Sequence, residues 1–72
     1  MRVSEKAARN FIRNRGRANL RILLELLQQN RNGQEIAKVL GVSRERVRQW
    51  RNLFGQTITL FQPYPEVLKS LR

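Results

Sequence analysis

The segment Gly33 to Phe54, with the sequence GQEIAKVLGVSRERVRQWRNLF, constrains the fold of this chain more than any other. Its first part predicts a short helix, because its apolar residues recur at helical spacing up to Leu40. Gly41 follows, and glycine readily adopts the left-handed conformation that ends many helices. Ser43 is a favourable N-cap residue, so a second helix is expected to begin directly after it. The segment therefore predicts two short helices joined by a tight turn.

The second predicted helix has two distinct faces. Its apolar residues have the spacing i, i+3 and i+7 and are Val47, Trp50 and Phe54. Its opposite face is polar and carries Glu45, Arg48, Gln49 and Asn52. A small residue, Ala37, stands where the two helices would touch. The combined pattern is that of a helix-turn-helix, whose second helix lies in the major groove of DNA. The alternative is a helical hairpin buried in a larger fold, which would have no reason to carry arginines at positions 44, 46, 48 and 51.

Residues 43–50, SRERVRQW, resemble the recognition helix in region 4 of bacterial primary sigma factors, which read the upstream promoter hexamer. The resemblance covers roughly residues 33–50. After Trp50 the chain departs from the sigma pattern, and it lacks the core-binding regions of a sigma factor. The resemblance implies base or near-base contacts for Arg44, Glu45, Arg48 and Gln49. More loosely, the segment also resembles the helix-turn-helix of phage Cro and repressor proteins and the DNA-binding tail of resolvases.

The chain is short and strongly basic. Its 72 residues include 15 Lys and Arg but only 5 Asp and Glu, which gives a formal net charge of +10. A polyanion is the natural partner of such a charge, and duplex DNA agrees with the helix-turn-helix pattern. A single domain of this size buries roughly 60% of the surface that its unfolded chain exposes. Its stability is therefore expected to be marginal unless it associates.

Several classes of protein are disfavoured by what the sequence lacks. The longest apolar run, residues 22–24, is interrupted by Glu25, so neither a membrane span nor a secretory signal is expected. We expect an intracellular protein that is cytoplasmic, associated with the nucleoid, and bacterial or phage-like. The absence of Cys, His and Asp disfavours disulfides, the usual zinc sites and Cys/His or Ser/His catalysis. We therefore expect no enzymatic activity, metal, cofactor, small-molecule ligand or membrane partner.

Two helices are expected before the helix-turn-helix. Ser4 would cap the first, which runs to about Asn14, and Gly16 would break it. Its apolar side would carry Val3, Ala7, Phe11 and Ile12. Asn19 would cap the second helix, which continues to about Gln29. The core stripe of this second helix is Leu20, Leu23, Leu24 and Leu27, widened by Ile22 and Leu26. Residues 30–33 are expected to form a turn.

The basic residues of the first helix have two interpretations. Residues 2–21 carry seven basic side chains and one acid, Glu5. They form either a solvated face, or a helix or arm that contacts phosphate and reaches toward the minor groove.

The C-terminal extension, residues 56–72, is expected to hold a strand and a short helix. Residues 57–61, TITLF, alternate β-branched and apolar residues after Gly55, which is expected to end the preceding helix. No second strand is evident, so this strand would pair with its copy in a homodimer. The alternative is an extended segment lying over the helices. Pro65 suits the first position of a helix through Leu71, with Val67, Leu68 and Leu71 pointing inward.

Together these patterns predict an all-α fold: a helix-turn-helix domain of four to five helices, with one C-terminal β-strand available for dimerisation. Residues 1–72 would form a single domain, with the helix-turn-helix at residues 33–54. The predicted function is sequence-specific binding of duplex DNA by a homodimeric transcriptional regulator. Two alternatives stay open: an accessory DNA-binding module of a recombinase or transposase, and a protein-interaction module that docks on polymerase or an anti-sigma factor.

The predicted DNA contacts fall into two groups. Base contacts are expected from the exposed face of the second helix, at Arg44, Glu45, Arg48, Gln49 and Asn52. Phosphate contacts are expected from side chains at its flanks and from the two preceding segments, at Gln34, Ser43, Arg46, Arg51, Lys6, Arg9 and Arg13.

Overall fold

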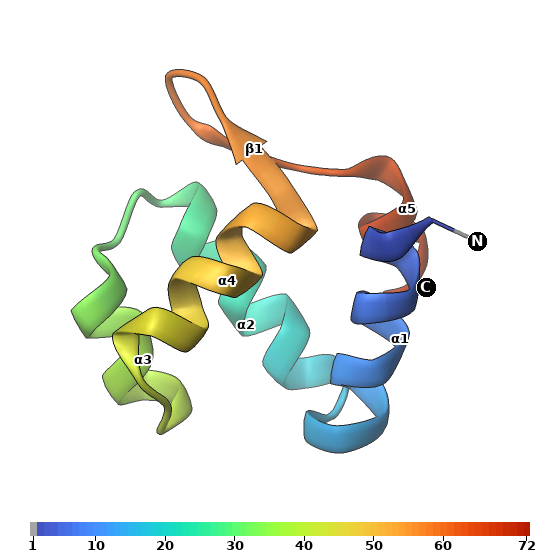
Figure 1. Ribbon diagram of the computed structural model, residues 1–72, viewed down its shortest axis with the longest axis horizontal. Helices are drawn as coiled ribbons and strands as arrows, with labels where there is room; N and C mark the ends of the chain where they lie inside the picture. The colour runs from blue at the N-terminus through green and yellow to red at the C-terminus, as the bar shows by residue number, and fades with distance from the viewer. Residues whose placement is uncertain (1) are drawn as a thin grey trace.

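Five helices and one β-hairpin follow one another along the chain in a computed structural model that describes residues 2–72 (Figure 1). The elements are α1 (Val3–Arg15), α2 (Arg17–Gln28), α3 (Gly33–Leu40), α4 (Arg44–Phe54), β1 (Gly55–Thr57), β2 (Phe61–Pro63) and α5 (Pro65–Lys69). The expected all-α class, with five helices around a helix-turn-helix, is confirmed. Within residues 2–72, no helix combines the length and the apolar character needed to cross a membrane.

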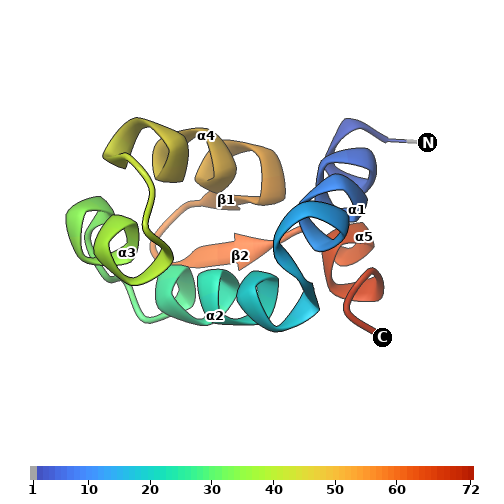
Figure 2. The same cartoon turned by 90° about the horizontal axis from the view of Figure 1, so that it is seen from below.

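The helices enclose the core from several sides. Figure 2 shows α4 and α2 on opposite sides of the molecule, with the hairpin between them. Helix α3 closes one end, and α1 and α5 lie together at the other. This arrangement leaves the outer side of α4 uncovered by any other element (Figures 1 and 2).

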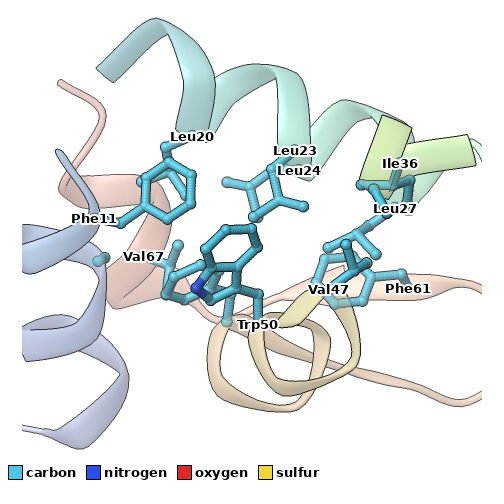
Figure 3. Packing of buried hydrophobic residues seen from close by; sticks show 13 residues of the cluster. Phe11, Leu20, Leu23, Leu24, Leu27, Ile36, Val47, Trp50, Phe61 and Val67 are labelled. Atoms are coloured by element: carbon cyan, nitrogen blue, oxygen red, sulfur yellow. The ribbon is translucent and has the colours of Figure 1, made fainter. Parts of the chain in front are cut away.

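The core is built on the leucine stripe of α2, as the sequence predicts. Leu20, Leu23, Leu24 and Leu27 are all buried. They face the apolar side of α4 and the ring of Phe11 from α1 (Figure 3). The Phe11 ring meets Trp50 edge to face, with a centroid distance of 4.9 Å and an interplanar angle of 72°. It meets Phe54 in the same way at 5.9 Å and 80°. The aromatic contacts therefore fix α1 against α4.

The start of α1 differs from the expectation. Arg2, not Ser4, occupies the N-cap position, and Ser4 lies buried inside the first turn. Its Oγ donates a hydrogen bond to Oε2 of Glu66, at 3.0 Å. Val3, expected in the core, is 73% exposed, whereas Ala8 is fully buried. The cause is α5, which packs on α1 and whose Glu66 binds Ser4, so that the side of α1 with Ser4 and Ala8 is the buried one.

The cap predicted for α2 is also wrong. Gly16 has φ 93° and ψ 152°, a conformation suited to glycine, and it separates α1 from α2 by a single residue. Asn19 therefore lies within α2, where its Nδ2 donates to the carbonyl oxygen of Arg15, at 2.6 Å. Ile22 is exposed and Leu26 is half-buried, so the leucine stripe is widened on one side only.

The C-terminal extension forms a hairpin within one chain. The predicted strand at residues 57–61 is wrong, because β1 pairs antiparallel with β2 in the register Gly55 with Pro63 and Thr57 with Phe61. Residues 58–60 form the tip between the strands. Gly55 is the first strand residue, and a Cβ there would overlap the Gln62 carbonyl oxygen and lie 2.7 Å from Cζ of Phe61. The backbones of the two strands approach closely because residue 55 has no side chain.

Helix α5 begins at Pro65, as expected, but it ends at Lys69. Val67 is fully buried and Leu71 is half-buried. Leu68 was expected to point inward and is instead exposed, because α5 packs on the rest of the molecule through the side that carries Val67.

Candidate functional site

Helices α3 and α4 meet at the tight turn that the sequence predicts. Gly41 has the left-handed conformation, with φ 70° and ψ 37°, and its backbone N–H donates to the carbonyl oxygen of Ala37. The same oxygen accepts from the N–H of Val42, at 3.0 Å. Ser43 then caps α4, since its Oγ accepts from the backbone N–H of Arg46, at 3.1 Å. These bonds satisfy backbone groups that two helix ends would otherwise leave unpaired.

Helix α4 is divided into a buried and an exposed face. Val47 and Phe54 are fully buried and Trp50 is nearly so, and all three lie in the core. Solvent reaches the opposite face, which carries Arg44, Glu45, Arg48, Gln49 and Asn52. The five side chains predicted to contact bases therefore share one uncovered surface, the reading face.

Two members of the reading face bind each other. Nη2 of Arg48 lies 2.6 Å from Oε1 of Glu45, and its Nε lies 3.1 Å from Oε2, so the guanidinium holds both carboxylate oxygens. The hydrogen bond from Arg48 lowers the pKa of the Glu45 carboxyl, and the same bond raises the pKa of Arg48. Both groups are therefore charged at neutral pH. Because the pair is exposed, water can replace either partner, and the pair is available for exchange with a ligand.

The start of α3 lies beside the reading face. Oδ1 of Asn32 caps this helix by accepting from the backbone N–H of Glu35, at 2.8 Å. Gln34 follows the cap and is exposed. A hollow between α3 and α4 is lined by Gly33, Arg44, Glu45, Val47, Arg48 and Arg51. Nη2 of Arg51 reaches back to the carbonyl oxygen of Arg31, at 3.5 Å. The structure thus brings Arg51 and Gly33, the residue before Gln34, to the same side of the molecule as the reading face.

The basic residues predicted on α1 do not share one environment. Lys6 and Arg13 are exposed. Arg9 instead pairs with Glu5, at 3.0 Å, and lines a hollow that includes Glu66 and Lys69 of α5. That hollow lies on a different side of α1 from the residues that contact α4.

The side of α1 that contacts α4 contains a residue not predicted as part of the site. Asn10, Asn14 and Arg15 line a hollow with Arg46 and Trp50 of α4. Arg46 was expected to contact phosphate, but Arg15 was counted only as part of a basic stretch. Its spacing from Phe11, i and i+4, was the available signal, because it places both residues on the same side of a helix.

Comparison with known proteins identifies the central part of this arrangement. A protein-family model described as a helix-turn-helix domain matches residues 20–57, more than half of the chain. The match begins in α2 and includes α3, α4 and β1, whereas α1, β2 and α5 lie outside it. No curated protein and no solved structure matched the chain. The resemblance of residues 43–50 to sigma region 4 therefore stays a prediction.

Proposed function

The chain belongs to a helix-turn-helix domain family, and from this premise we propose that it is a sequence-specific duplex-DNA-binding protein that regulates transcription. Helix-turn-helix domains bind DNA through their second helix, and such domains are typically not enzymes. The observation that carries the proposal is the exposed polar face of α4, which lies opposite a buried apolar face on the same helix. A helix of this kind can enter the major groove without disturbing the core that holds it.

The side chains of the reading face suit particular base edges. Arg44 and Arg48 can each donate to O6 and N7 of guanine, and Gln49 and Asn52 suit adenine. Glu45 can accept from N4 of cytosine. In the unbound protein Arg48 and Glu45 hydrogen-bond to each other. We propose that on DNA binding these bonds are replaced by hydrogen bonds to base edges in the groove.

Phosphate contacts are proposed at the edges of the reading face and on α1. At the start of α3, Gln34 is exposed beside backbone N–H groups, which favour an anion. On α4 the proposed contacts are Ser43, Arg46 and Arg51. On α1 they are Lys6 and Arg13, because Arg9 lines the hollow beside α5, on a different side of α1 from the residues that contact α4. The excess of basic over acidic residues supports a large contribution from counterion release, so affinity should fall steeply with salt.

Selection of bound duplexes from a random pool tests the function. A recovered consensus of several base pairs is the expected result, and recovery of unrelated sequences would contradict specific binding. Titration of mismatched sites then tests the assignment of roles. Gln49→Ala should lower affinity for the preferred site roughly 5- to 150-fold and relax preference at one or two positions. Arg13→Ala should lower affinity for all DNA sequences about equally. Equal behaviour of the two variants would refute the assignment.

We also propose that the chain acts as a homodimer, although not through the unpaired strand that the sequence predicts. The unpaired strand does not exist, since β1 and β2 pair within the chain. What supports a dimer is the hairpin tip, where Ile58 is 77% exposed and Leu60 is 56% exposed. Regulators of this size commonly present two recognition helices to a two-fold symmetric site.

Sedimentation equilibrium without DNA tests the dimer. Wild-type protein is expected to dimerise in the tens of micromolar range, and Ile58→Asp should weaken this association while the helices stay folded. A wild-type monomer that Ile58→Asp leaves unchanged would refute a dimer formed through the tip.

A further inference from the structure

Two guanidinium groups from different helices converge on one aromatic ring. Cζ of Arg15, the last residue of α1, lies 5.2 Å from the centroid of the Trp50 ring. Cζ of Arg46, in the first turn of α4, lies 6.0 Å from the same ring. Contact between a guanidinium and an aromatic face is attractive and restricts where the charge can lie. Both arginines also line the same hollow between α1 and α4.

The hollow in which these groups lie, the α1–α4 hollow, is about 230 Å³ in volume and has no acidic lining residue. The hollow beside α5 includes Glu5 and Glu66, and the hollow between α3 and α4 includes Glu45. The four ion pairs found among residues 2–72 involve neither Arg15 nor Arg46. The polar part of the lining consists of two guanidiniums, which only donate hydrogen bonds, and the amides of Asn10 and Asn14, which can donate as well as accept; the rest of the lining is apolar or aromatic. Such a lining fits an anion.

The position of the hollow indicates which anion. Arg46 stands on α4, the helix whose outer face we propose to enter the major groove. A helix in that groove has a sugar-phosphate strand along each flank, and side chains beside the helix reach those strands. The α1–α4 hollow runs along one flank of α4, so a phosphate of the bound duplex is the nearest polyanion to it. An acidic protein segment is the competing occupant. If such a segment occupied the hollow, replacing its arginines would leave the salt dependence of DNA binding unchanged.

We infer that Arg15 and Arg46, assisted by Asn14, bind the backbone of one DNA strand beside the major groove that receives α4. This makes α1, which lies outside the family match at residues 20–57, part of the DNA interface. It adds Arg15 to the phosphate contacts. It also gives Trp50 a second role, because the buried ring that fixes α4 in the core also positions both guanidiniums. The inference rests on the proposed function and assigns a specific surface to it.

Salt titration of a selected duplex by fluorescence anisotropy tests this inference on the full chain. Arg15→Gln and Arg46→Gln should each reduce the slope of log K against log salt concentration by about 0.9, the value for one phosphate contact, while base preference stays the same. Arg17→Gln is the matched control. It makes the same change in charge two residues away, on a side chain that lines the hollow beside α5 instead. Thermal unfolding by circular dichroism establishes that each variant is folded.

A scan with uncharged methylphosphonate linkages identifies the contact directly. At one phosphate position, a methylphosphonate should weaken DNA binding by the wild-type protein and by the Arg17→Gln variant. The same linkage should leave binding by the Arg15→Gln variant unaffected. Arg15→Lys, which keeps the charge, should restore part of the salt slope. The inference would be overturned if Arg15→Gln left the salt slope unchanged, or if Arg17→Gln reduced the slope as much as Arg15→Gln does. Either result would leave the proposed function intact. Absence of sequence preference in the wild-type protein would refute the proposed function itself.

Discussion

The contact between α1 and α4 depends on one phenylalanine, and replacing Phe11 with leucine tests how much it stabilises the fold. The ring is 5% exposed and makes edge-to-face contacts with both Trp50 and Phe54. Such a pair contributes about 0.5–1.5 kcal/mol beyond the burial of its area. Loss of both pairs should therefore lower the free energy of unfolding by about 1–3 kcal/mol, because leucine retains most of the apolar volume but not the ring.

Phe61→Leu is a suitable control for this substitution. Phe61 is also 5% exposed, and the two aromatic pairs found among residues 2–72 do not include it. The same chemical change at this position removes apolar volume only, which costs less than about 1.5 kcal/mol when the replacement is similar in size. Phe11→Leu should thus be the more destabilising of the two.

Urea denaturation followed by circular dichroism and by Trp50 fluorescence measures both variants. A domain of this length has a total stability of roughly 4–11 kcal/mol, so Phe11→Leu should stay folded in buffer. A loss of about 2 kcal/mol corresponds to a decrease in Tm of about 8–16 °C. The two probes should report one transition, because Trp50 lies against α1 and cannot be exposed separately from it. Equal destabilisation by Phe61→Leu would refute the role assigned to ring geometry.

Three further substitutions test local features of the fold. Gly55→Ala should destabilise the protein by about 1–3 kcal/mol, because the methyl group overlaps the backbone of β2, and an unchanged urea midpoint would contradict this close approach. Ser43→Ala should cost about 1 kcal/mol through loss of the α4 cap, and a cost below a few tenths of a kcal/mol would show that the cap is dispensable. Ser4→Ala should cost about 1 kcal/mol because it removes a hydrogen bond to Glu66, and a double-mutant cycle with Glu66→Gln should give a coupling energy that differs from zero.

The helix-turn-helix could be predicted in detail because its determinants are local. Ser43 caps a helix by binding an N–H only three residues away, and Gly41 acts through its own backbone. The apolar face of α4 repeats at the helical period from Val47 to Phe54, over about two turns, which is long enough for the period to be recognised. Each of these signals acts within one or two turns of the chain, so no knowledge of distant contacts was required.

The two wrong caps show where local signals are overridden. Serine at a helix start favours the N-cap by about 1 kcal/mol, a preference that one tertiary contact can exceed. Ser4 binds Glu66, which is 62 residues away, and α1 consequently begins two residues earlier than its cap signal suggests. Asn19 fails differently, because a single glycine is sufficient to separate α1 from α2. The position of α5 against α1 could not be read from either segment alone. The role of Arg15 also depends on a contact between distant segments, since its partner ring lies on α4. Its own segment of the sequence therefore did not reveal that role.

The hairpin shows how a correct pattern can lead to a wrong strand. Strands of three residues are too short to display a period of two, and the alternation in TITLF falls mainly on the exposed tip. The consequence for assembly is physical. The backbone groups expected to pair with a second copy are paired within the chain, so any association through the tip must come from side-chain burial. Because β1 begins directly after α4, no flexible linker separates the hairpin from the reading face. In a dimer formed at the tip, the two reading faces would therefore have a fixed relative position. The spacing of its two half-sites would then be fixed by the hairpin.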